Sequence, residues 1–388
     1  MIDNAGDYSP KSCGLCGSQA LEVILDKATP LSMLSDNKTI PISLRKIECI
    51  NCGLVRDGHE ANAEKLNRYY RFDYTLNVNF DEYHFLTLEG AVPRSKLFFD
   101  WIWRHLGVRE PEQIRKVLEV GCGAGHLLAR VRSAMPEAYF FGTELSQAAR
   151  KMAIDKGFHV ILGGIEQVDE SGFDLIYTVG VLEHVPHPGD FLSTLRKRLA
   201  PGGTLVLVQP SQDVISSDIY FSDHLHHFGT DHLSMYAQRI GFTEVVKEVG
   251  YTLMPNFSLH LWERSEPSSD HIRWGNTQCR ESIAFHEGMF EQVNRLVDEI
   301  QSNPARKLAV FGLNERYALL HAYSRLGDIE IVCGLSDVEP NVQVDFPVVK
   351  PGRVKEFPVT DVLMCVNQIH KQYVSERLAP LGVTVHAL

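Results

Sequence analysis

The sequence lacks the features that mark membrane-spanning, secreted and nucleic-acid-binding proteins. No apolar run approaches the roughly 20 residues that a membrane span needs. Residues 1–10 are polar and acidic, unlike the basic and apolar start of a signal peptide. The net charge is −11 and no long basic run is present, which argues against nonspecific binding to nucleic acid or to an anionic membrane. We therefore expect a cytoplasmic protein with no nucleic-acid partner and no membrane partner.

Cysteine is scarce, with eight residues in a chain of 388, so a disulfide-rich secreted scaffold is excluded. Four of them form two Cys-x-x-Cys pairs, Cys13 with Cys16 and Cys49 with Cys52. Two such turns complete the tetrahedral four-cysteine site of a structural zinc ion and leave no open position for catalysis. A redox Cys-x-x-Cys normally lies where a strand meets a helix, and no helical pattern follows directly here. Structural Zn2+ is the favoured interpretation, with redox chemistry or free thiols as alternatives.

Three glycines at alternate positions mark the most informative stretch, Lys116–His126. It reads as a buried parallel strand, a turn and the start of a helix. A dinucleotide fingerprint would place its last glycine at His126, and Glu119 before the turn would repel a pyrophosphate. A backbone turn with this acid suits a ligand that has a polar, cationic end. The alternative is a glycine turn with only a folding role.

Further strand patterns alternate with helical ones along the centre of the chain. The second strand ends in Glu144, which is well placed to accept hydrogen bonds from both hydroxyls of a cofactor ribose. Strands are expected at 116–120, 138–144, 160–162, 173–178, 204–209, 241–246 and 256–262. The order predicts an α/β fold with a mainly parallel sheet.

Two of these segments carry a resemblance. Lys116–His126 resembles motif I of class I S-adenosylmethionine (SAM) methyltransferases, and Leu182-Glu183-His184-Val185 resembles the motif after their fourth strand. The resemblance implies that Glu119 meets the methionine moiety and that His184 lies near the reacting methyl group. A helix-capping role is the alternative for His184. The implied cofactor contacts are Glu119, Gly121, Gly123, Gly125, Glu144, Ile165, Glu166 and Val179.

Histidines cluster between residues 220 and 233. Three interpretations remain open. Asp223 and His224 form a catalytic base pair, which the near-neutral pKa of histidine favours. Alternatively, a divalent metal binds there, or the segment is an ordinary approach to a helix. The metal ligands would be Asp223, His226, His227 and His232.

Two regions flank this central part. Residues 67–85 are rich in aromatic side chains, among them Tyr70 and Tyr74, and form either a substrate lid or a packing arm. After a linker at 263–270 and a long helix at 281–302, a second α/β unit follows. Its strand-to-helix turn holds Gly312 but no dinucleotide fingerprint, so we expect a unit that shapes the substrate cleft rather than a nucleotide site.

The whole arrangement is similar to the C-methyltransferases of nucleotide-deoxysugar pathways. The resemblance implies a class I SAM methyltransferase (Rossmann-like) sheet with an N-terminal four-cysteine zinc domain and a C-terminal small Rossmann-like α/β domain. The expected divisions are a zinc-binding domain, an aromatic lid and linking helix, a SAM-binding domain, a linker with a long helix, and the C-terminal domain, at 1–60, 61–106, 107–265, 266–305 and 306–388.

This family methylates a carbon next to the ketone of a nucleotide-linked 4-keto-sugar. A base removes the acidified proton, and the enolate attacks the methyl group. The resemblance implies that Asp223 and His224 correspond to the family's Glu-His base pair and that Tyr70 or Tyr74 is the lid tyrosine. Phe221 and His227 stand where the family has tyrosines, so these two substrate positions depart from its pattern.

The sequence thus predicts SAM-dependent C-methylation of a nucleotide-activated 4-keto-deoxysugar, with His224, Asp223 and His184 as the catalytic residues. The predicted substrate contacts are Tyr70, Tyr74, Phe221 and His227. Two alternatives remain: a SAM-dependent O- or N-methyltransferase acting on a sugar or another small molecule, and an inactive zinc-binding interaction protein.

Overall fold

The computed structural model separates into two compact units. The first comprises Met1–Leu25, Arg45–Ile219 and Asp223–Arg280. The second comprises Asp26–Leu44, Tyr220–Ser222 and Glu281–Leu388. The structure describes residues 12–27, 31–59, 63–74, 82, 84–87, 90–106, 111–267, 275, 277–337, 340, 342–366 and 371–388. Of the linker expected at 263–270, residues 268–270 lie outside the described residues.

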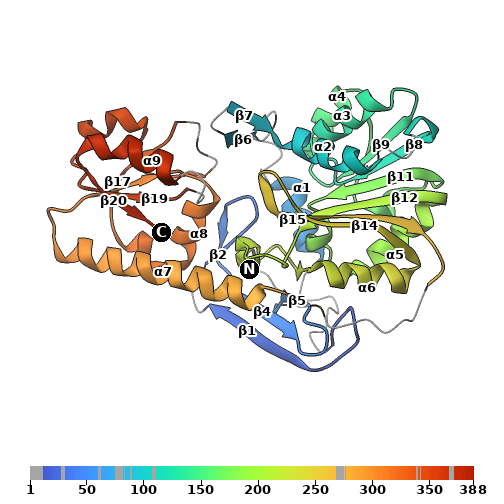
Figure 1. Ribbon diagram of the computed structural model, residues 1–388, viewed down its shortest axis with the longest axis horizontal. Helices are drawn as coiled ribbons and strands as arrows, with labels where there is room; N and C mark the ends of the chain where they lie inside the picture. The colour runs from blue at the N-terminus through green and yellow to red at the C-terminus, as the bar shows by residue number, and fades with distance from the viewer. Residues whose placement is uncertain are drawn as a thin grey trace. The chain divides into compact units, whose positions relative to one another are not determined.

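A seven-stranded sheet forms the centre of the first unit (Figure 1), in the order β10-β9-β8-β11-β12-β15-β14. Its five parallel strands are β8 (Lys116–Val120), β9 (Tyr139–Glu144), β10 (His159–Leu162), β11 (Phe173–Val179) and β12 (Leu199–Pro210). The antiparallel pair is β14 (Phe242–Tyr251) and β15 (Met254–Arg264). This is the class I SAM methyltransferase fold, as predicted.

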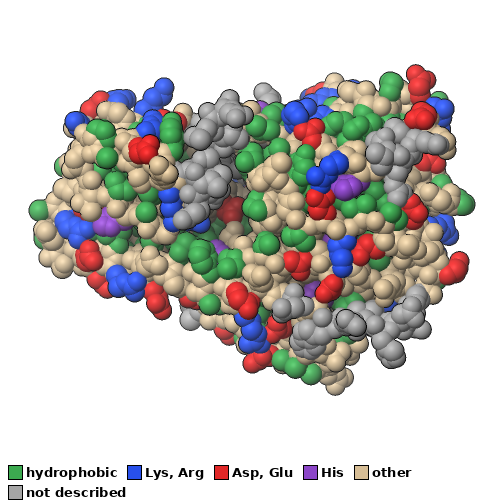
Figure 2. All heavy atoms as spheres, viewed as in Figure 1, with side chains coloured by type: hydrophobic (Ala, Val, Ile, Leu, Met, Phe, Trp, Pro, Cys, Tyr) green, Lys and Arg blue, Asp and Glu red, His purple; other side chains and the backbone are tan. Residues whose placement is uncertain are grey.

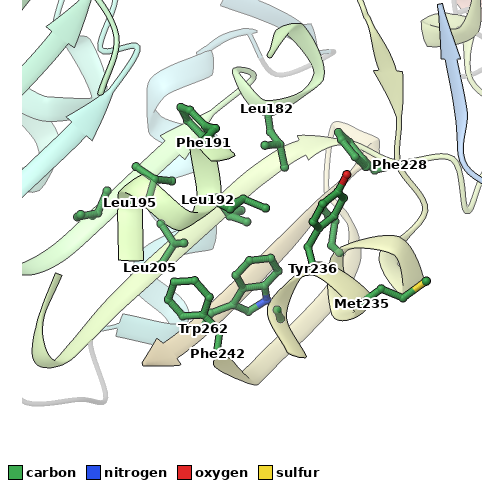
Figure 3. Packing of buried hydrophobic residues seen from close by; sticks show 14 of the residues in the cluster. Leu182, Phe191, Leu192, Leu195, Leu205, Phe228, Met235, Tyr236, Phe242 and Trp262 are labelled. Atoms are coloured by element: carbon green, nitrogen blue, oxygen red, sulfur yellow. The ribbon is translucent and has the colours of Figure 1, made fainter. Parts of the chain in front are cut away.

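Strand residues alternate between the two faces of this sheet, so helices cover both. Figure 1 draws α3 (His126–Ala134) and α4 (Gln147–Asp155) on one side and α5 (Pro188–Arg198) and α6 (Thr230–Ile240) on the other. In Figure 3, apolar side chains of α5 and α6 meet Leu205 of β12 and Trp262 of β15. The opposite face packs Val117, Leu175 and Val206 against the α3 side. Because consecutive strand residues belong to different clusters, both faces are buried, as a central parallel sheet requires.

The cysteine pairs adjoin a small sheet in the order β1-β4-β5-β13, since Cys13 and Cys16 precede β1, Cys49 ends β4 and Cys52 precedes β5. Its strands are β1 (Leu21–Lys27), β4 (Leu44–Cys49), β5 (Val55–Asp57) and β13 (His226–His227). Strand β13 pairs with β5 although about 170 residues separate them in sequence. The pairing therefore carries the histidine segment into the cysteine-bearing sheet.

Three more elements precede the central sheet in the chain. Helix α1 (Ala63–Phe72) carries the aromatic segment, and the hairpin of β6 (His84–Thr87) and β7 (Gly90–Pro93) follows it. Helix α2 (Arg94–Leu106) then packs Phe98, Trp101 and Ile102 into the same apolar cluster as α3. This helix corresponds to the linking helix expected within residues 61–106.

The second unit holds a five-stranded parallel sheet in the order β18-β17-β16-β19-β20. Its strands are β16 (Leu308–Phe311), β17 (Ile331–Leu335), β18 (Val348–Val349), β19 (Asp361–Met364) and β20 (Thr384–Ala387). Its helices are α7 (Cys279–Ser302), whose first two residues belong to the first unit, α8 (Glu315–Tyr323) and α9 (Lys371–Leu378). A short hairpin of β2 (Ser32–Met33) and β3 (Thr39–Ile40) also belongs to it.

The contact units divide the chain differently from the expected domains. The expected zinc-binding domain at 1–60 is shared, because residues 26–44 belong to the second unit and the cysteine pairs to the first. The residues between 12 and 388 that the structure describes contain no helix long and apolar enough to cross a membrane.

Candidate active site

The turn after β8 is shaped by glycine. Gly121, Gly123 and Gly125 all have positive φ values, 75°, 52° and 76°. A Cβ atom on Gly121 would lie 2.5 Å from Cγ2 of Val181, too close for any side chain. Gly125 is the N-terminal capping position of α3 and supplies no side-chain hydrogen bond to it. The first N–H groups of this helix therefore remain suited to a polar ligand.

Glu119 lies one strand residue before this turn and is buried. The hydroxyl of Tyr177, on the neighbouring strand β11, donates a hydrogen bond of 2.9 Å to Glu119 Oε2. Burial raises the pKa of Glu119 to about 8, and the Tyr177 hydrogen bond reduces that rise. A carboxyl group held in this state favours a cation beside it, because a nearby positive charge would restore the ionised form.

Glu144 ends the adjacent strand β9, and its two carboxylate oxygens accept hydrogen bonds from different backbone groups. The Gly123 N–H donates to Oε2 at 2.8 Å, and the Ser146 N–H donates to Oε1 at 2.7 Å. Burial raises the pKa of Glu144, and these N–H groups oppose the rise. Each oxygen has a second lone pair, so the carboxylate can still accept from the hydroxyls of a ribose.

The remaining cofactor positions differ in exposure. Val179, at the end of β11, is half-buried and Glu166 is exposed. Ile165 is completely buried in the apolar cluster of Figure 3, so the predicted contact of its side chain with adenine would require rearrangement. The residues of the turn and the two strand-end acids fit SAM: the glycines provide a backbone cradle, and Glu119 faces it with a carboxyl group.

His184 follows the fourth parallel strand in a short turn, Leu182–His184, next to Val181, which packs on Gly121. Its Nδ1 atom lies 2.9 Å from the backbone oxygen of Asp223 and 2.6 Å from the Tyr70 hydroxyl. A backbone oxygen only accepts, so Nδ1 carries the proton. The Tyr70 hydroxyl in turn donates to Asp223 Oδ2 at 3.0 Å. Nε2 of the neutral ring is therefore the basic nitrogen.

His224 pairs with a carboxylate that the sequence did not indicate. Its Nδ1–H donates to Asp218 Oδ1, and His227 Nδ1 lies 2.6 Å from Asp218 Oδ2. The rings of His224 and His184 are edge-to-face, with centroids 4.6 Å apart. One polar atom each of Glu183, His184 and His224 lie within 4.8 Å of one another. The structure thus brings together the two predicted catalytic histidines.

Burial and nearby charges shift the pKa values of these two histidines in opposite directions. Burial lowers the pKa of His184 to about 4, and the neighbouring His224 lowers it further. Burial also opposes charge on His224, but Asp218, Asp223 and Glu183 outweigh it and raise its pKa to about 9. At neutral pH, His184 is thus neutral and His224 cationic.

The predicted Asp223–His224 pair takes a different form in the structure. The Asp223 carboxylate accepts from Tyr70 and lies 3.8 Å from His184 Nδ1, whereas Asp218 holds the His224 ring. Tyr70 therefore reaches the histidine pair from α1. The Tyr74 ring packs against that of Tyr70, at 5.1 Å between centroids.

The two other residues predicted in the histidine segment, His227 and Phe221, lie in different parts of the structure. His227 is fully buried on Asp218. Phe221 belongs to the second unit, where it forms a bridge with Met33. The hydroxyl of its neighbour Tyr220, in the same unit, donates to Glu287 at 2.7 Å.

The alternative metal site in this segment lacks one ligand, because backbone groups use both ring nitrogens of His232. The Gly229 N–H donates to Nδ1, and Nε2 lies 2.8 Å from the Cys52 oxygen.

The four cysteines of the N-terminal pairs converge. Sγ–Sγ distances are 3.6 Å between Cys13 and Cys52 and 3.5 Å between Cys16 and Cys49. All four sulfurs lie within 4.8 Å of one another. Four sulfurs about 2.3 Å from a zinc ion would be separated by about 3.8 Å, so the donor set fits tetrahedral Zn2+.

Comparison with known proteins agrees with this geometry. Residues 90–255 match the family model described as a methyltransferase domain. The central part of the chain is thus similar to methyltransferase domains. The match starts at the first residue of β7 and ends in β15, so the domain includes the glycine turn, both strand-end acids and both histidines. The expected enzyme class, a SAM-dependent methyltransferase, is confirmed at the level of this domain.

Curated relatives match part of the chain. A tRNA U34 carboxymethyltransferase of Pseudoalteromonas translucida (strain TAC 125) is 30% identical over 191 residues, which cover 45% of this chain and 59% of the relative. The protein of the same name from Aliivibrio salmonicida (strain LFI1238) is 36% identical over 117 residues, covering 28% and 36%. The chain thus spans little more than half the length of the first relative.

Solved structures resemble the methyltransferase domain more distantly. Magnesium protoporphyrin IX methyltransferase from Synechocystis PCC 6803 is 16% identical with a TM-score of 0.36, over 43% of this chain and 82% of the other. A SAM-dependent methyltransferase from Mesorhizobium loti is 20% identical with a TM-score of 0.35, over 42% and 97%.

The prediction of the protein's partners is wrong. We expected a nucleotide-sugar substrate and no nucleic-acid partner, whereas the curated relatives are named for their action on a tRNA. Net charge and the absence of a basic run argue only against charge-driven, nonspecific binding. They do not address recognition of one RNA by shape and base contacts. On the face drawn in Figure 2, basic and acidic side chains are interspersed. This mixed charge also argues only against nonspecific binding and does not address recognition of one RNA.

Proposed function

We propose that this protein is a SAM-dependent methyltransferase that methylates a carbon acidified by a neighbouring carbonyl, through an enolate formed at the His184–His224 pair. One observation carries the proposal: a neutral histidine lies beside a carboxylate-paired histidine, in a segment that packs on the glycine turn. An enolate requires a base for the α-proton and a stabilising group for the oxygen, and such a pair supplies both.

Glu119, the glycine turn and Glu144 would hold the cofactor. When bound, SAM supplies a methyl group on a positively charged sulfur, open to in-line attack by a carbon nucleophile. Glu119 would bind the cationic amino group of its methionine end, and the uncapped start of α3 would face its polar groups. Val181 links this region to the histidines, since it packs on Gly121 two residues before Glu183. The methyl donor and the base would then share one site.

The four cysteines are proposed to hold a structural zinc ion. Their spacing supports this assignment, and the Cys52 backbone oxygen also receives His232 Nε2–H from the methyltransferase domain. Metal analysis by mass spectrometry should give one zinc per chain in the wild type and none in Cys52→Ser. Cys333→Ser, a buried cysteine of the second sheet, is the control that should keep its zinc. A wild-type protein purified without chelators that holds no zinc would refute the assignment.

A tRNA acceptor is a second candidate, favoured by the curated relatives. They are named for uridine 34 of tRNA and are 30% identical over 191 and 192 residues. Under this candidate the same cofactor site serves a base of an RNA. The two candidates share the donor and differ in the acceptor.

The experiment that tests the proposed function is product analysis with SAM labelled in its methyl group. The acceptor panel contains small ketones, including nucleotide-linked 4-keto-sugars, and unmodified tRNA. Proton NMR of a small-molecule product should show a new methyl group on carbon with loss of the neighbouring α-proton. Label on oxygen or nitrogen would refute the enolate. Label in the RNA alone would establish the second candidate.

A further inference from the structure

Asp218 is a buried carboxylate that had no place in the predicted site. Its Oδ1 accepts from His224 Nδ1, and its Oδ2 lies 2.6 Å from His227 Nδ1. The Gln212 amide also donates to Oδ2, at 2.5 Å. The group is 3% exposed, so its charge is hidden from solvent. A buried carboxylate with three donors is held in one position, and it fixes the rings that it contacts.

The charge of Asp218 must be balanced within this cluster. A buried ion without a partner is strongly unfavourable, and among the three donors only the histidines can carry a positive charge. His227 is disfavoured as the cation because burial, and then the charge of nearby Lys46, lower its pKa to about 4. The Lys46 ammonium group donates to the His224 backbone oxygen at 3.0 Å and pairs with Asp57 at 3.3 Å. His224 therefore remains as the partner that neutralises Asp218.

Resting on the proposed function, we propose that Asp218 is a positioning residue that divides the work between the two histidines. Through Asp218, His224 stays an imidazolium that donates a hydrogen bond to the enolate oxygen. His184, which has a backbone oxygen instead of a carboxylate on Nδ1, remains the neutral base. This assignment reverses the predicted role of His224.

The proton and electron balance follows from this assignment. His184 Nε2 takes the α-proton, and the electron pair of the broken carbon–hydrogen bond moves into the enolate, whose oxygen accepts from His224 Nε2–H. The α-carbon then bonds the methyl group, and the sulfur keeps the electron pair of the bond that breaks. The carbonyl re-forms, and His184 releases its proton to solvent. His224 keeps its proton throughout.

The surroundings of the two rings are consistent with these charges. The groups that face them are Asp218, Asp223, Glu183, His227, Lys46 and Tyr70. Burial raises the pKa of Glu183 to about 7, and the His224 charge opposes that rise. Asp218, Asp223 and Glu183 together favour the charged form of His224 and raise its pKa to about 9. Burial lowers the pKa of His184 to about 4.

The first test requires no acceptor. Nitrogen NMR of the full chain at neutral pH, with histidines assigned by His224→Gln and His184→Gln, should show His224 doubly protonated and His184 neutral. In Asp218→Asn, His224 should become neutral. Asp218→Glu should restore its charge, and Asp213→Asn, which alters a nearby acid outside the cluster, should leave it unchanged. A neutral His224 in the wild type would overturn the proposal, as would a charged His224 in a folded Asp218→Asn protein.

The second test uses the pH dependence of turnover with an acceptor identified above. With SAM saturating at every pH, the wild-type kcat should be level near neutral pH and fall above about pH 9, where His224 loses its proton. Asp218→Asn should lower kcat about 100-fold and shift the falling limb to lower pH, with KM for SAM unchanged. A wild-type rate that rises through pH 9 would make His224 the base and refute the proposal. If no acceptor is turned over, the proposed function fails, and the NMR result still decides the role of Asp218.

Discussion

The mainly parallel sheet of the first unit and the parallel sheet of the second unit each have a strand-to-helix turn after an inner strand, β8 and β16, and the polar groups of the two turns have different partners. After β8, α3 begins at Gly125 with no side-chain cap. After β16, α8 begins at Asn314, whose side chain accepts from the Arg316 N–H at 3.0 Å. The Asn314 amide also donates to the Cys365 oxygen on the neighbouring segment. A side chain caps the helix after the second turn, whereas the helix after the first turn starts without a side-chain cap.

Acidic side chains also distinguish the turn after β8 from the turn after β16. The first turn lies between two carboxyl groups, the buried Glu119 and the half-buried Glu144, and both have raised pKa values. In the second turn Gly312 approaches the backbone, since its Cβ would lie 2.7 Å from the Cys365 oxygen. Glycine there serves packing. Two turns with similar backbones can therefore have different roles, and the nearby polar groups identify the binding turn.

The largest difference between the two turns is expected when a glycine of each is replaced by alanine. Gly121→Ala should weaken SAM binding more than about 100-fold, because the Cβ would overlap Val181 and the backbone has a positive φ. Gly312→Ala should destabilise the second sheet and leave SAM binding unchanged. Titration calorimetry with SAM and thermal unfolding check both variants. Equal loss of SAM binding in the two would show that the turns do not differ as argued.

The next largest effect is expected at the ribose position. Glu144→Ala should weaken SAM binding about 30-fold, because two hydrogen bonds to a charged acceptor are lost. The matched control is Glu315→Ala, which removes an exposed acid from the start of α8. Calorimetry checks both, and unchanged affinity in Glu144→Ala would contradict the ribose assignment.

The pH dependence of SAM binding sharpens the role of Glu119. Its raised pKa of about 8 means that the free protein holds a proton there at neutral pH, which a cationic ligand displaces. The affinity should therefore rise about tenfold between about pH 7 and pH 9, and binding should release a proton. Glu119→Gln should bind more weakly and without this dependence. Calorimetry in buffers of different ionisation enthalpy measures the proton release, and its absence in the wild type would contradict the assignment.

The smallest effect concerns the capped helix. Asn314→Ala should lower the stability of the second unit by about 1 kcal/mol, because the first turn of α8 loses its cap. SAM affinity should not change. Chemical unfolding followed by hydrogen exchange in α8 measures the loss, and a change in SAM binding would indicate that the second turn contributes to the cofactor site.

Local patterns in the sequence were sufficient to place together the residues of the proposed cofactor site. Glu119, the alternate glycines and Glu144 are spaced along one strand-turn-helix unit and its neighbouring strand, so the periodicity of the chain places them together. The cysteine pairs could also be recognised from the sequence alone, because each Cys-x-x-Cys motif places two thiolates at one turn. The strands of the first sheet were predicted from the same periodicity.

Only the tertiary structure decided the histidine half. The spacing of Asp218 and His224 matches no motif, and their contact depends on a turn at 217–220 and on β13 pairing with the distant β5. The sequence placed Phe221 in the same site, whereas folding assigns it to the second unit with Met33. The charge of each histidine is likewise a tertiary property. Burial and the nearest carboxylate set it, and these depend on contacts between segments far apart in sequence.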